Sequence, residues 1–440
     1  MQQDYQDHIA TLLKRYEYLM QMLAGAEGIL LHSGIDRTYY QDDQDTPFRA
    51  FGHFNHWLPV NRPNQVLLVR PGRRPVYFQV IPEDYWNEQA VNTASWWAES
   101  FDIVQLGRPE QIKAELDQLQ GLVFLGEPEC FAAFLGIKPD LINPQSCLDY
   151  LDYHRAYKQP YEVTQLRTAN QLALVGHQAA ASCFLDGGSE YDIHLAYLQA
   201  CQVLEHETPY TNIVAVNEKA AILHYQNKRR YANSEQHLDN QVLLLDAGCR
   251  VNAYCSDITR TTCSAHVHPI FKQLLTGMEH LQQQIIALIR PGLPFSELHH
   301  IALELVGQLL IDNDIIKCGL EEAMDAQLPA VFLPHGLGHL LGIQVHDVGG
   351  WLINPDGKQQ TPPEHLLYLR NTRTLEESMV CTIEPGIYFI PLLLDKVISD
   401  TKGALLNQHL ITELLPLGGI RIEDNIHVTS NGVTNLTRGN

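Results

Sequence analysis

The chain lacks any long hydrophobic run. None of its apolar stretches approaches the ~20 residues that a helix needs to cross a bilayer. The N-terminal segment is polar and has no apolar core of the kind found in signal peptides. The nine cysteines are odd in number, are scattered from Cys130 to Cys381, and form no CxxC pair. Such cysteines fit reduced thiols better than a disulfide framework or a thiolate zinc site. We therefore expect a cytoplasmic protein without membrane partners.

Basic residues are also scarce. The 30 Lys and Arg residues face 51 Asp and Glu residues, which gives a formal net charge of -21. A protein this acidic repels phosphate backbones, so we expect no nucleic-acid partner. The remaining composition, with 45% hydrophobic and 18% charged residues, is that of a globular protein.

The pattern of the sequence changes near residue 155. At 440 residues the chain is too long for one ordinary core. Strand-like runs beginning at Gln65 and Gly121 alternate with helical stretches, which predicts an α/β domain at 1–155. A second domain is then predicted at 156–440, and Pro160 stands where its first helix can begin.

The second predicted domain combines helices with short strand pairs. A long helical pattern runs from Pro269 through Leu310, and strands are expected at Gln241–Asp246 and Tyr254–Thr262. Strands joined by short turns, with helices between the pairs, predict an α+β domain whose antiparallel sheet is covered by helices on one side.

Five acidic or histidine residues stand out from their neighbours in this second domain. Asp246 ends the apolar run VLLLD, and Asp257 follows eleven residues later, so a hairpin could bring the two carboxylates together. Glu384 lies in TIEPGIYF, between apolar residues and a Pro-Gly turn. Glu423 lies in GGIRIEDNIHV, where strand alternation puts it on one face with Arg421 and Asn425. His339 lies in PHGLGHLLG, where the glycines make a regular helix unfavourable and permit close backbone approach.

Four carboxylates and one imidazole form an oxygen-rich donor set. By ligand hardness the set suits Mn²⁺, with Co²⁺ or Zn²⁺ as alternatives. Four carboxylates would leave a single ion with too much negative charge, whereas two divalent ions balance it. Taken singly, each residue has an ordinary explanation: Asp246 or Glu384 as a turn residue, Glu423 as a surface partner of Arg421, and His339 as a partly buried histidine.

The ordered set of motifs resembles a known family. The motifs are LLHSGIDRTYYQDD, YHRAYKQPYE, TPYTNIVAVNEKAAILHY, LLLDAG, SDITRT, HGLGHLLGIQVHDVGG, LRNTR, TIEPGIYF and GGIRIEDN. In this order they resemble the pita-bread metallopeptidases, and within them the bacterial prolidases (Xaa-Pro dipeptidases) and the related organophosphorus acid anhydrolase of marine bacteria. The resemblance covers nearly the whole chain.

The resemblance implies a creatinase-like α/β N-terminal domain, an α+β pita-bread catalytic domain, and a homodimer. It implies two divalent metal ions, most simply Mn²⁺. Asp246 would bind one ion, His339 and Glu384 the other, and Asp257 and Glu423 both. Such a centre hydrolyses Xaa-Pro dipeptides when a metal-bridging hydroxide attacks the scissile carbonyl.

Further roles follow from the same resemblance. Glu384 is expected to carry a proton to the prolyl nitrogen, and His346 to stabilise the oxyanion. Arg370 in LRNTR would read the substrate carboxylate, because its planar fork matches a carboxylate, although a surface loop arginine is an equal alternative. The other residues expected around the substrate are His224, His335, Tyr210, Arg421 and, for the amino group, Asp42 or Asp43.

Three alternatives stay open at this point. The first is aminopeptidase P activity on longer peptides, which a carboxylate-binding Arg370 would hinder. The second is organophosphate hydrolysis, which is weakened by Phe295, because the anhydrolase carries a tyrosine there. The third is a non-catalytic binding module, which the complete set of metal ligands disfavours.

Overall fold

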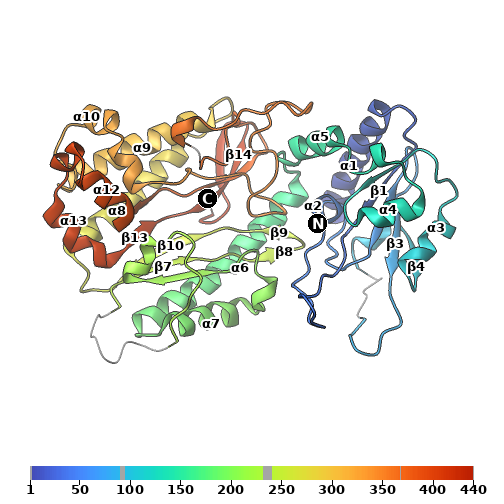
Figure 1. Ribbon diagram of the computed structural model, residues 1–440, viewed down its shortest axis with the longest axis horizontal. Helices are drawn as coiled ribbons and strands as arrows, with labels where there is room; N and C mark the ends of the chain where they lie inside the picture. The colour runs from blue at the N-terminus through green and yellow to red at the C-terminus, as the bar shows by residue number, and fades with distance from the viewer. Residues whose placement is uncertain (1, 90–94, 231–239, 367, 440) are drawn as a thin grey trace. The chain divides into compact units, whose positions relative to one another are not determined.

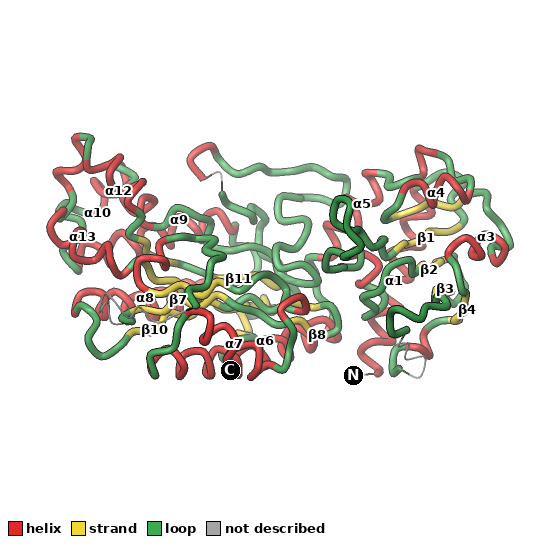
Figure 2. The backbone as a smooth tube through the Cα atoms, turned by 60° about the horizontal axis from the view of Figure 1, so that its bottom comes forward, coloured by secondary structure: helices red, strands yellow, loops and turns green. Residues whose placement is uncertain are grey.

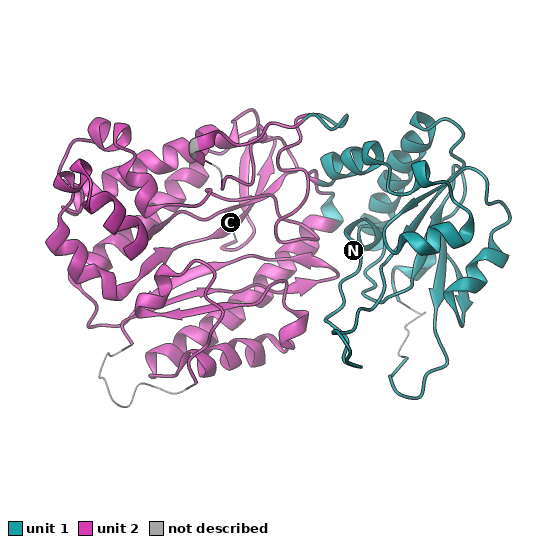
Figure 3. Ribbon diagram, viewed as in Figure 1, with its two compact units in different colours: residues 1–155, 159–161, 354–358 teal, residues 156–158, 162–353, 359–440 magenta. Residues whose placement is uncertain are grey.

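The computed structural model describes residues 2–89, 95–230, 240–366 and 368–439. The chain divides into two compact units, shown in Figure 3. Unit 1 consists of residues 1–155, 159–161 and 354–358, and unit 2 of residues 156–158, 162–353 and 359–440. The small segment 354–358 joins unit 1 although it lies far along the sequence, which no pattern in the sequence indicated.

Unit 1 is built on a five-stranded mixed sheet in the order β4-β3-β2-β1-β5. The β1–β2 and β2–β3 pairs are antiparallel, and the β1–β5 and β3–β4 pairs are parallel. All residues of β1, β2 and β5 are buried, which explains why these strands read as unbroken apolar runs. The strands are β1 Gly28–His32, β2 Val66–Val69, β3 Val76–Val80, β4 Asp102–Leu106 and β5 Leu122–Leu125.

Helices pack against this sheet in unit 1. The longest, α1, buries Tyr5, Ile9, Leu12, Tyr16 and Leu19. This spacing of three and four residues forms one apolar stripe, and the helix contacts β1 and α5. The helices are α1 Gln2–Met22, α2 Gly52–Asn55, α3 Ile112–Glu115, α4 Glu129–Leu135 and α5 Gln145–Arg155, with short 3-10 turns at Ala98–Ser100, Pro109–Gln111 and Pro139–Leu141.

Unit 2 contains small antiparallel sheets. One has the strand order β10-β7-β6, another β11-β14-β15, and β12–β13 and β8–β9 form two-stranded pairs. The strands are β6 Ile213–Val216, β7 Val242–Asp246, β8 Arg250–Val251, β9 Tyr254–Cys255, β10 Thr259–Cys263, β11 Val380–Ile383, β12 Gly386–Tyr388, β13 Gly419–Arg421, β14 Asp424–Thr429 and β15 Gly432–Asn435.

Helices flank these sheets, with α6 and α7 alongside β7 and β10 in both views (Figures 1 and 2). Proline stands at the first position of α6, α8 and α12, where its missing N–H is not needed. The helices are α6 Pro160–Leu185, α7 Glu190–Cys201, α8 Pro269–Leu288, α9 Phe295–Asp312, α10 Leu320–Asp325, α11 Leu328–Phe332, α12 Pro391–Ile398 and α13 Gln408–Leu414. Five 3-10 turns complete the described part, at Glu205–Glu207, Asn217–Ala221, Glu364–Leu366, Thr401–Leu405 and Leu415–Leu417.

Two details of unit 2 differ from the sequence prediction. The helical pattern from Pro269 through Leu310 is two helices, because Pro291-Gly292 and Pro294 interrupt it. The helices were also predicted on one side of the sheet, but β7 is buried on both faces. Leu243 and Leu245 pack in a cluster with α6 and α7, whereas Val242 and Leu244 belong to the main core with α8 and α9.

No helix in the described part of the chain is long and apolar enough to cross a membrane. The cores of the two units consist of aliphatic and aromatic side chains that are almost fully buried.

Candidate metal centre

Unit 2 contains a cavity of about 640 Å³ that brings together residues from distant parts of the sequence. All five predicted metal ligands line this cavity. The lining also includes the predicted residues His224, His335, His346, Arg370 and Arg421. The predicted ligands in it are Asp246, Asp257, His339, Glu384 and Glu423.

Two of these carboxylates come from neighbouring parts of one hairpin. Asp246 is the last residue of β7 and is paired in register with Thr259 of β10. Asp257 was predicted on the second strand, but it lies in the irregular segment between β9 and β10. There its N–H donates to the side chain of Asn425, and the amide of Asn425 donates back to the Asp257 carbonyl. These contacts hold the Asp257 backbone away from a regular ladder.

Asp246 is held from both sides by hydrogen bonds. The Tyr210 hydroxyl donates to one carboxylate oxygen at 2.6 Å, and Nη2 of Arg421 donates to the other at 2.6 Å. Tyr210 therefore reaches the site by contact with Asp246. Burial raises the pKa of Asp246 to about 7, and the Arg421 charge opposes this rise.

His339 is positioned by an irregular loop locked to β11. The N–H of His339 donates to Oγ1 of Thr382 at 3.0 Å, and the N–H of Thr382 donates to the His339 carbonyl at 2.9 Å. Only glycine fits at position 338, because a Cβ there would lie 2.1 Å from the Thr382 carbonyl oxygen. Nδ1 of His339 lies 3.0 Å from the Leu340 carbonyl, to which it donates. This hydrogen bond leaves Nε2 available as a ligand atom.

The ligand atoms converge tightly. Atoms of Asp257, His339 and Glu423 lie within 4.8 Å of one another, in a group able to hold a metal ion. Nε2 of His339 lies 3.3 Å from Asp257 Oδ2 and 3.4 Å from Glu384 Oε1. Glu384 directly follows β11, and Glu423 lies between β13 and β14.

The buried carboxylates of this cluster would be stabilised as anions by a bound cation. Burial raises the pKa of Glu384, and it raises the pKa of Glu423 well above the usual range, with the charge of Asp257 adding to the effect. Glu423 Oε1 is buried without a hydrogen-bond partner among the described residues. Burial lowers the pKa of His339, but the neighbouring carboxylates outweigh burial and raise it. Hard oxygen donors together with one imidazole fit divalent metal ions. The oxygen without a hydrogen-bond partner is a further reason to expect an ion there.

Two further predicted histidines face the same cavity. The His346 ring stands at 89° to the His339 ring with the centroids 4.4 Å apart. His335 donates from Nδ1 to the Gly336 carbonyl, so its Nε2 accepts from the Tyr388 hydroxyl at 2.8 Å. Burial lowers the pKa of both His335 and His346 to about 3, so both rings are neutral.

Tyr388, Thr259 and Thr382 support the site, although the sequence prediction gave them no role. Nη1 of Arg421 donates to the Tyr388 hydroxyl, and Nε of Arg421 donates to Oγ1 of Thr259. Thr259 in turn donates to Glu423 Oε2 at 2.6 Å, and Thr382 donates to Glu384 Oε1 at 3.1 Å. All three lie inside the motifs noted above, and their closeness in sequence to a ligand was the available signal.

The remaining predicted residues lie elsewhere or at the edge of this arrangement. Arg370 is exposed but lines the cavity. Asp42 and Asp43 lie in an exposed turn of unit 1, where the Asp43 N–H donates to the Asp42 side chain. Phe295 is fully buried at the start of α9. The roles of Asp42 and Asp43 stay predictions.

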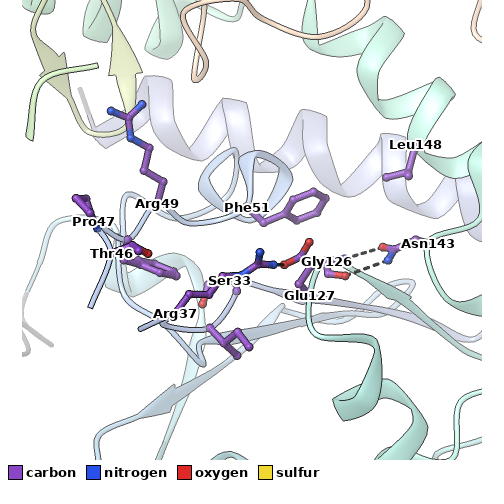
Figure 4. Close-up of a pocket in the computed structure, with 13 residues that line it drawn as sticks. Ser33, Arg37, Thr46, Pro47, Arg49, Phe51, Gly126, Glu127, Asn143 and Leu148 are labelled. Carbon is purple, nitrogen blue, oxygen red and sulfur yellow. Dashed lines mark hydrogen bonds and ion pairs between the residues drawn. The ribbon is translucent and has the colours of Figure 1, made fainter. Parts of the chain in front are cut away.

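Unit 1 has a cavity of its own, of about 600 Å³, shown in Figure 4. Its acidic lining residue is Glu127, which forms an ion pair with Arg37, while Asn143 is bonded to the backbone of Gly126. None of the predicted site residues lines it. The five predicted metal ligands therefore all lie in unit 2.

Comparisons with known proteins agree with this division. The model of metallopeptidase family M24 matches residues 164–430, and that of the Xaa-Pro dipeptidase N-terminal domain matches residues 3–153. The chain is 40% identical over 436 residues to the Xaa-Pro dipeptidase of Pseudoalteromonas haloplanktis, which covers 99% of this chain and 97% of the relative. It is 40% identical over 438 residues to that of Aeromonas hydrophila subsp. hydrophila, with 99% and 98% covered.

Solved structures show the same fold. Aminopeptidase P from Escherichia coli with the inhibitor Pro-Leu matches with a TM-score of 0.75 at 23% identity, covering 100% of this chain and 95% of that chain. This match confirms the predicted fold class, an α/β creatinase-like N-terminal domain followed by an α+β pita-bread domain.

Proposed function

The chain belongs to metallopeptidase family M24, and we propose that it hydrolyses Xaa-Pro dipeptides. The observation that carries the proposal is the convergence of Asp257, His339 and Glu423 in a buried group beside the exposed Arg370. The first three residues provide a metal centre, and the arginine provides a cation for a substrate carboxylate. Relatives that are 40% identical over nearly the whole chain and are named Xaa-Pro dipeptidases support the same substrate class.

The donor set would hold two divalent ions, and its hardness favours Mn²⁺. In this proposal Asp246 would hold one ion, His339 and Glu384 would hold the other, and Asp257 and Glu423 would contribute to both. When bound, such ions supply Lewis acidity and lower the pKa of water.

The protein's own residues then handle protons and orientation. Glu384 is the proton carrier in this proposal, because it lies in the cavity with its Oε1 held by Thr382. The neutral imidazole of His346 donates a hydrogen bond toward the scissile carbonyl oxygen, and His224 lines the substrate space. Arg421 shapes the site by holding Asp246 and Tyr388.

Selectivity for dipeptides rests on Arg370 in this proposal, while His335, whose ring nitrogens already bond Gly336 and Tyr388, lines the same cavity. The bond before proline is a tertiary amide without an N–H, so recognition depends on the ring and on the free carboxylate. A guanidinium binds that carboxylate through two charge-assisted hydrogen bonds. A tripeptide such as Ala-Pro-Ala carries no carboxylate at this position.

The Arg370→Ala variant tests this assignment. We expect kcat/KM for Ala-Pro to fall about 10- to 100-fold, as loss of charged hydrogen bonds implies, while kcat/KM for Ala-Pro-Ala changes much less. Arg290→Ala, at an exposed arginine that does not line the cavity, is the matched control. An unchanged preference for dipeptides in Arg370→Ala would show that another group reads the carboxylate.

Other parts of the sequence interpretation stay predictions. They are a homodimer, the choice of Mn²⁺ over other divalent ions, a cytoplasmic location, a substrate contact by Asp43, and organophosphate hydrolysis as a side activity. No observation on the described residues favours phosphotriesters over peptides as the substrate.

A further inference from the structure

A buried ion pair lies in unit 2. Nζ of Lys158 is 3.0 Å from Oδ2 of Asp347, and each side chain is only 1% exposed. Removing two charges from water is expensive, and an apolar pair of similar volume is often as stable. A contribution to the stability of the fold is therefore a weak explanation for this ion pair. Its location beside His346 suggests a role in the site instead.

Asp347 directly follows His346 in a loop without helix or strand. The Asp347 N–H donates to the Leu340 carbonyl at 2.9 Å, which closes the loop on itself. The loop is tied to β11 through the Leu341 N–H, which donates to the Val380 carbonyl. Lys158 is tied to the same region, because its N–H donates to the Ser378 carbonyl at 2.8 Å.

Gly342 makes room for the pair. A Cβ at this position would lie 2.2 Å from Asp347 Oδ2 and 3.0 Å from Lys158 Nζ. The Gly342 carbonyl also accepts from the N–H of Cys255 at 2.8 Å. The ion pair thus packs against a bare stretch of backbone in the same loop that carries His346.

We propose that the Lys158–Asp347 pair is a positioning device for His346. Residues 343–346 of the loop belong to no helix or strand, so the ion pair and the Asp347 N–H fix the backbone next to His346. That backbone sets the direction in which the His346 ring enters the cavity, where the ring now stands 4.4 Å from His339. Lys158 and Asp347 are therefore positioning residues that do not touch substrate. The inference rests on the proposed function only for the catalytic role of His346.

A double-mutant cycle tests the inference. We expect Asp347→Asn to lower kcat on Ala-Pro by about 10- to 100-fold, the scale on which misplacement of a catalytic group acts, with KM changed less than about 3-fold. In a His346→Ala background, Asp347→Asn should lower kcat by less than about 2-fold further. Glu190→Gln, at another buried carboxylate of unit 2, should combine additively with His346→Ala.

The Lys158→Met/Asp347→Leu double variant distinguishes an effect on the placement of His346 from an effect on the stability of the fold. Its apolar pair should keep the thermal midpoint near that of the wild type, yet lose kcat as Asp347→Asn does. Wild-type kcat in this variant would overturn the inference, as would additivity of Asp347→Asn with His346→Ala.

An NMR measurement that does not depend on catalysis distinguishes the positioning role of Lys158 and Asp347 from the proposed dipeptidase function. In ¹⁵N-histidine-labelled protein, Asp347→Asn and the double variant should shift the His346 ring signals, and Glu190→Gln should leave them in place. If wild-type protein fails to cleave Ala-Pro, the proposed function is wrong, but a His346 shift still supports the positioning role. Unmoved His346 signals in both variants would refute the positioning role whatever the activity.

Discussion

Glu423 shows how burial prepares a carboxylate for the metal-binding role that we propose. One oxygen accepts from Thr259, and the other is buried without a partner among the described residues. Burial raises the pKa of Glu423 well above its usual range, so the metal-free protein holds it at a disadvantage as an anion. A bound cation would remove that disadvantage, which is the physical basis for the proposed role of Glu423 as a metal ligand.

Glu423→Gln separates metal binding from folding. We expect metal content per chain to fall by at least one ion, and kcat/KM on Ala-Pro to fall by at least ~100-fold, since even residues that only orient ligands contribute 10- to 100-fold. The metal-free variant should unfold at the same temperature as metal-free wild type or higher, because the buried charge is gone. Elemental analysis measures the metal content, and calorimetry measures the unfolding temperature. Full metal content in the variant would exclude Glu423 as a ligand.

His32 in unit 1 predicts a pH dependence of stability. Nδ1 of this buried ring accepts from the Gly34 N–H at 3.0 Å, and burial lowers its pKa to about 4. Because the folded pKa lies below the unfolded value of about 6.5, the unfolded chain takes up the proton first. The stabilisation is complete above pH 6.5 and is lost as the pH falls toward 4.

The expected size is about 2 kcal/mol of unfolding free energy lost by this one group between pH 7.5 and pH 5. His32→Asn keeps an acceptor near Gly34 and removes the titration, so its stability should decline less over the same range. Urea unfolding of both proteins at the two pH values measures the difference. Parallel declines would show that His32 titrates normally.

At the scale of elements, the site depends on how closely the His339 loop approaches β11. The two hydrogen bonds between His339 and Thr382 require the bare Cα of Gly338. Thr382 also donates to Glu384, so one residue of β11 sets the spacing of two candidate ligands.

Gly338→Ala should therefore weaken metal binding. The added Cβ would meet the Thr382 carbonyl oxygen at 2.1 Å, so the loop must move away from β11. We expect metal affinity to fall at least 10-fold and unfolding free energy to fall by about 1–3 kcal/mol, as for overpacking. Gly319→Ala is the control, because a Cβ there meets nothing within 4 Å. A metal titration followed by calorimetry measures the affinity of each variant. Equal metal affinity in the two variants would contradict a role for the close approach of the His339 loop to β11.

Local patterns predicted the elements better than the contacts between them. The apolar run ending in Asp246 is β7, and Pro160 begins α6, because burial and proline geometry act locally. The break between α8 and α9 was missed because apolar spacing continues across it. The supporting roles of Thr259 and Tyr388 were missed, since Thr259 bonds Glu423 from 164 residues away and only tertiary packing brings the two residues together.

At the scale of the whole molecule, metal binding should appear as stability. A ligand that binds only the folded state at 100 times its Kd adds about 2.7 kcal/mol to the unfolding free energy. We expect Mn²⁺ to stabilise metal-stripped wild type by this amount and to leave Glu423→Gln much less affected. Denaturant unfolding with and without Mn²⁺ measures it, and equal stabilisation of both proteins would place the ion elsewhere.

The division into an α/β part and an α+β part follows from composition and periodicity, and the family match agrees with it. Segment 354–358 joined unit 1 unexpectedly, since its association depends on tertiary contacts such as that of Gly357 with Asp149. The candidate ligands could be proposed because the motifs are long and ordered, whereas the ion pair of Lys158 and Asp347 connects positions that carry no joint pattern.

The decisive experiment for the proposed function is hydrolysis of Ala-Pro, Ala-Pro-Ala and Ala-Ala by metal-stripped protein, with and without added Mn²⁺. We expect cleavage of Ala-Pro alone, and only when metal is added. Cleavage of Ala-Pro-Ala at a comparable rate would contradict dipeptide selectivity by Arg370, and no cleavage of any of the three peptides with metal present would contradict the proposed function itself.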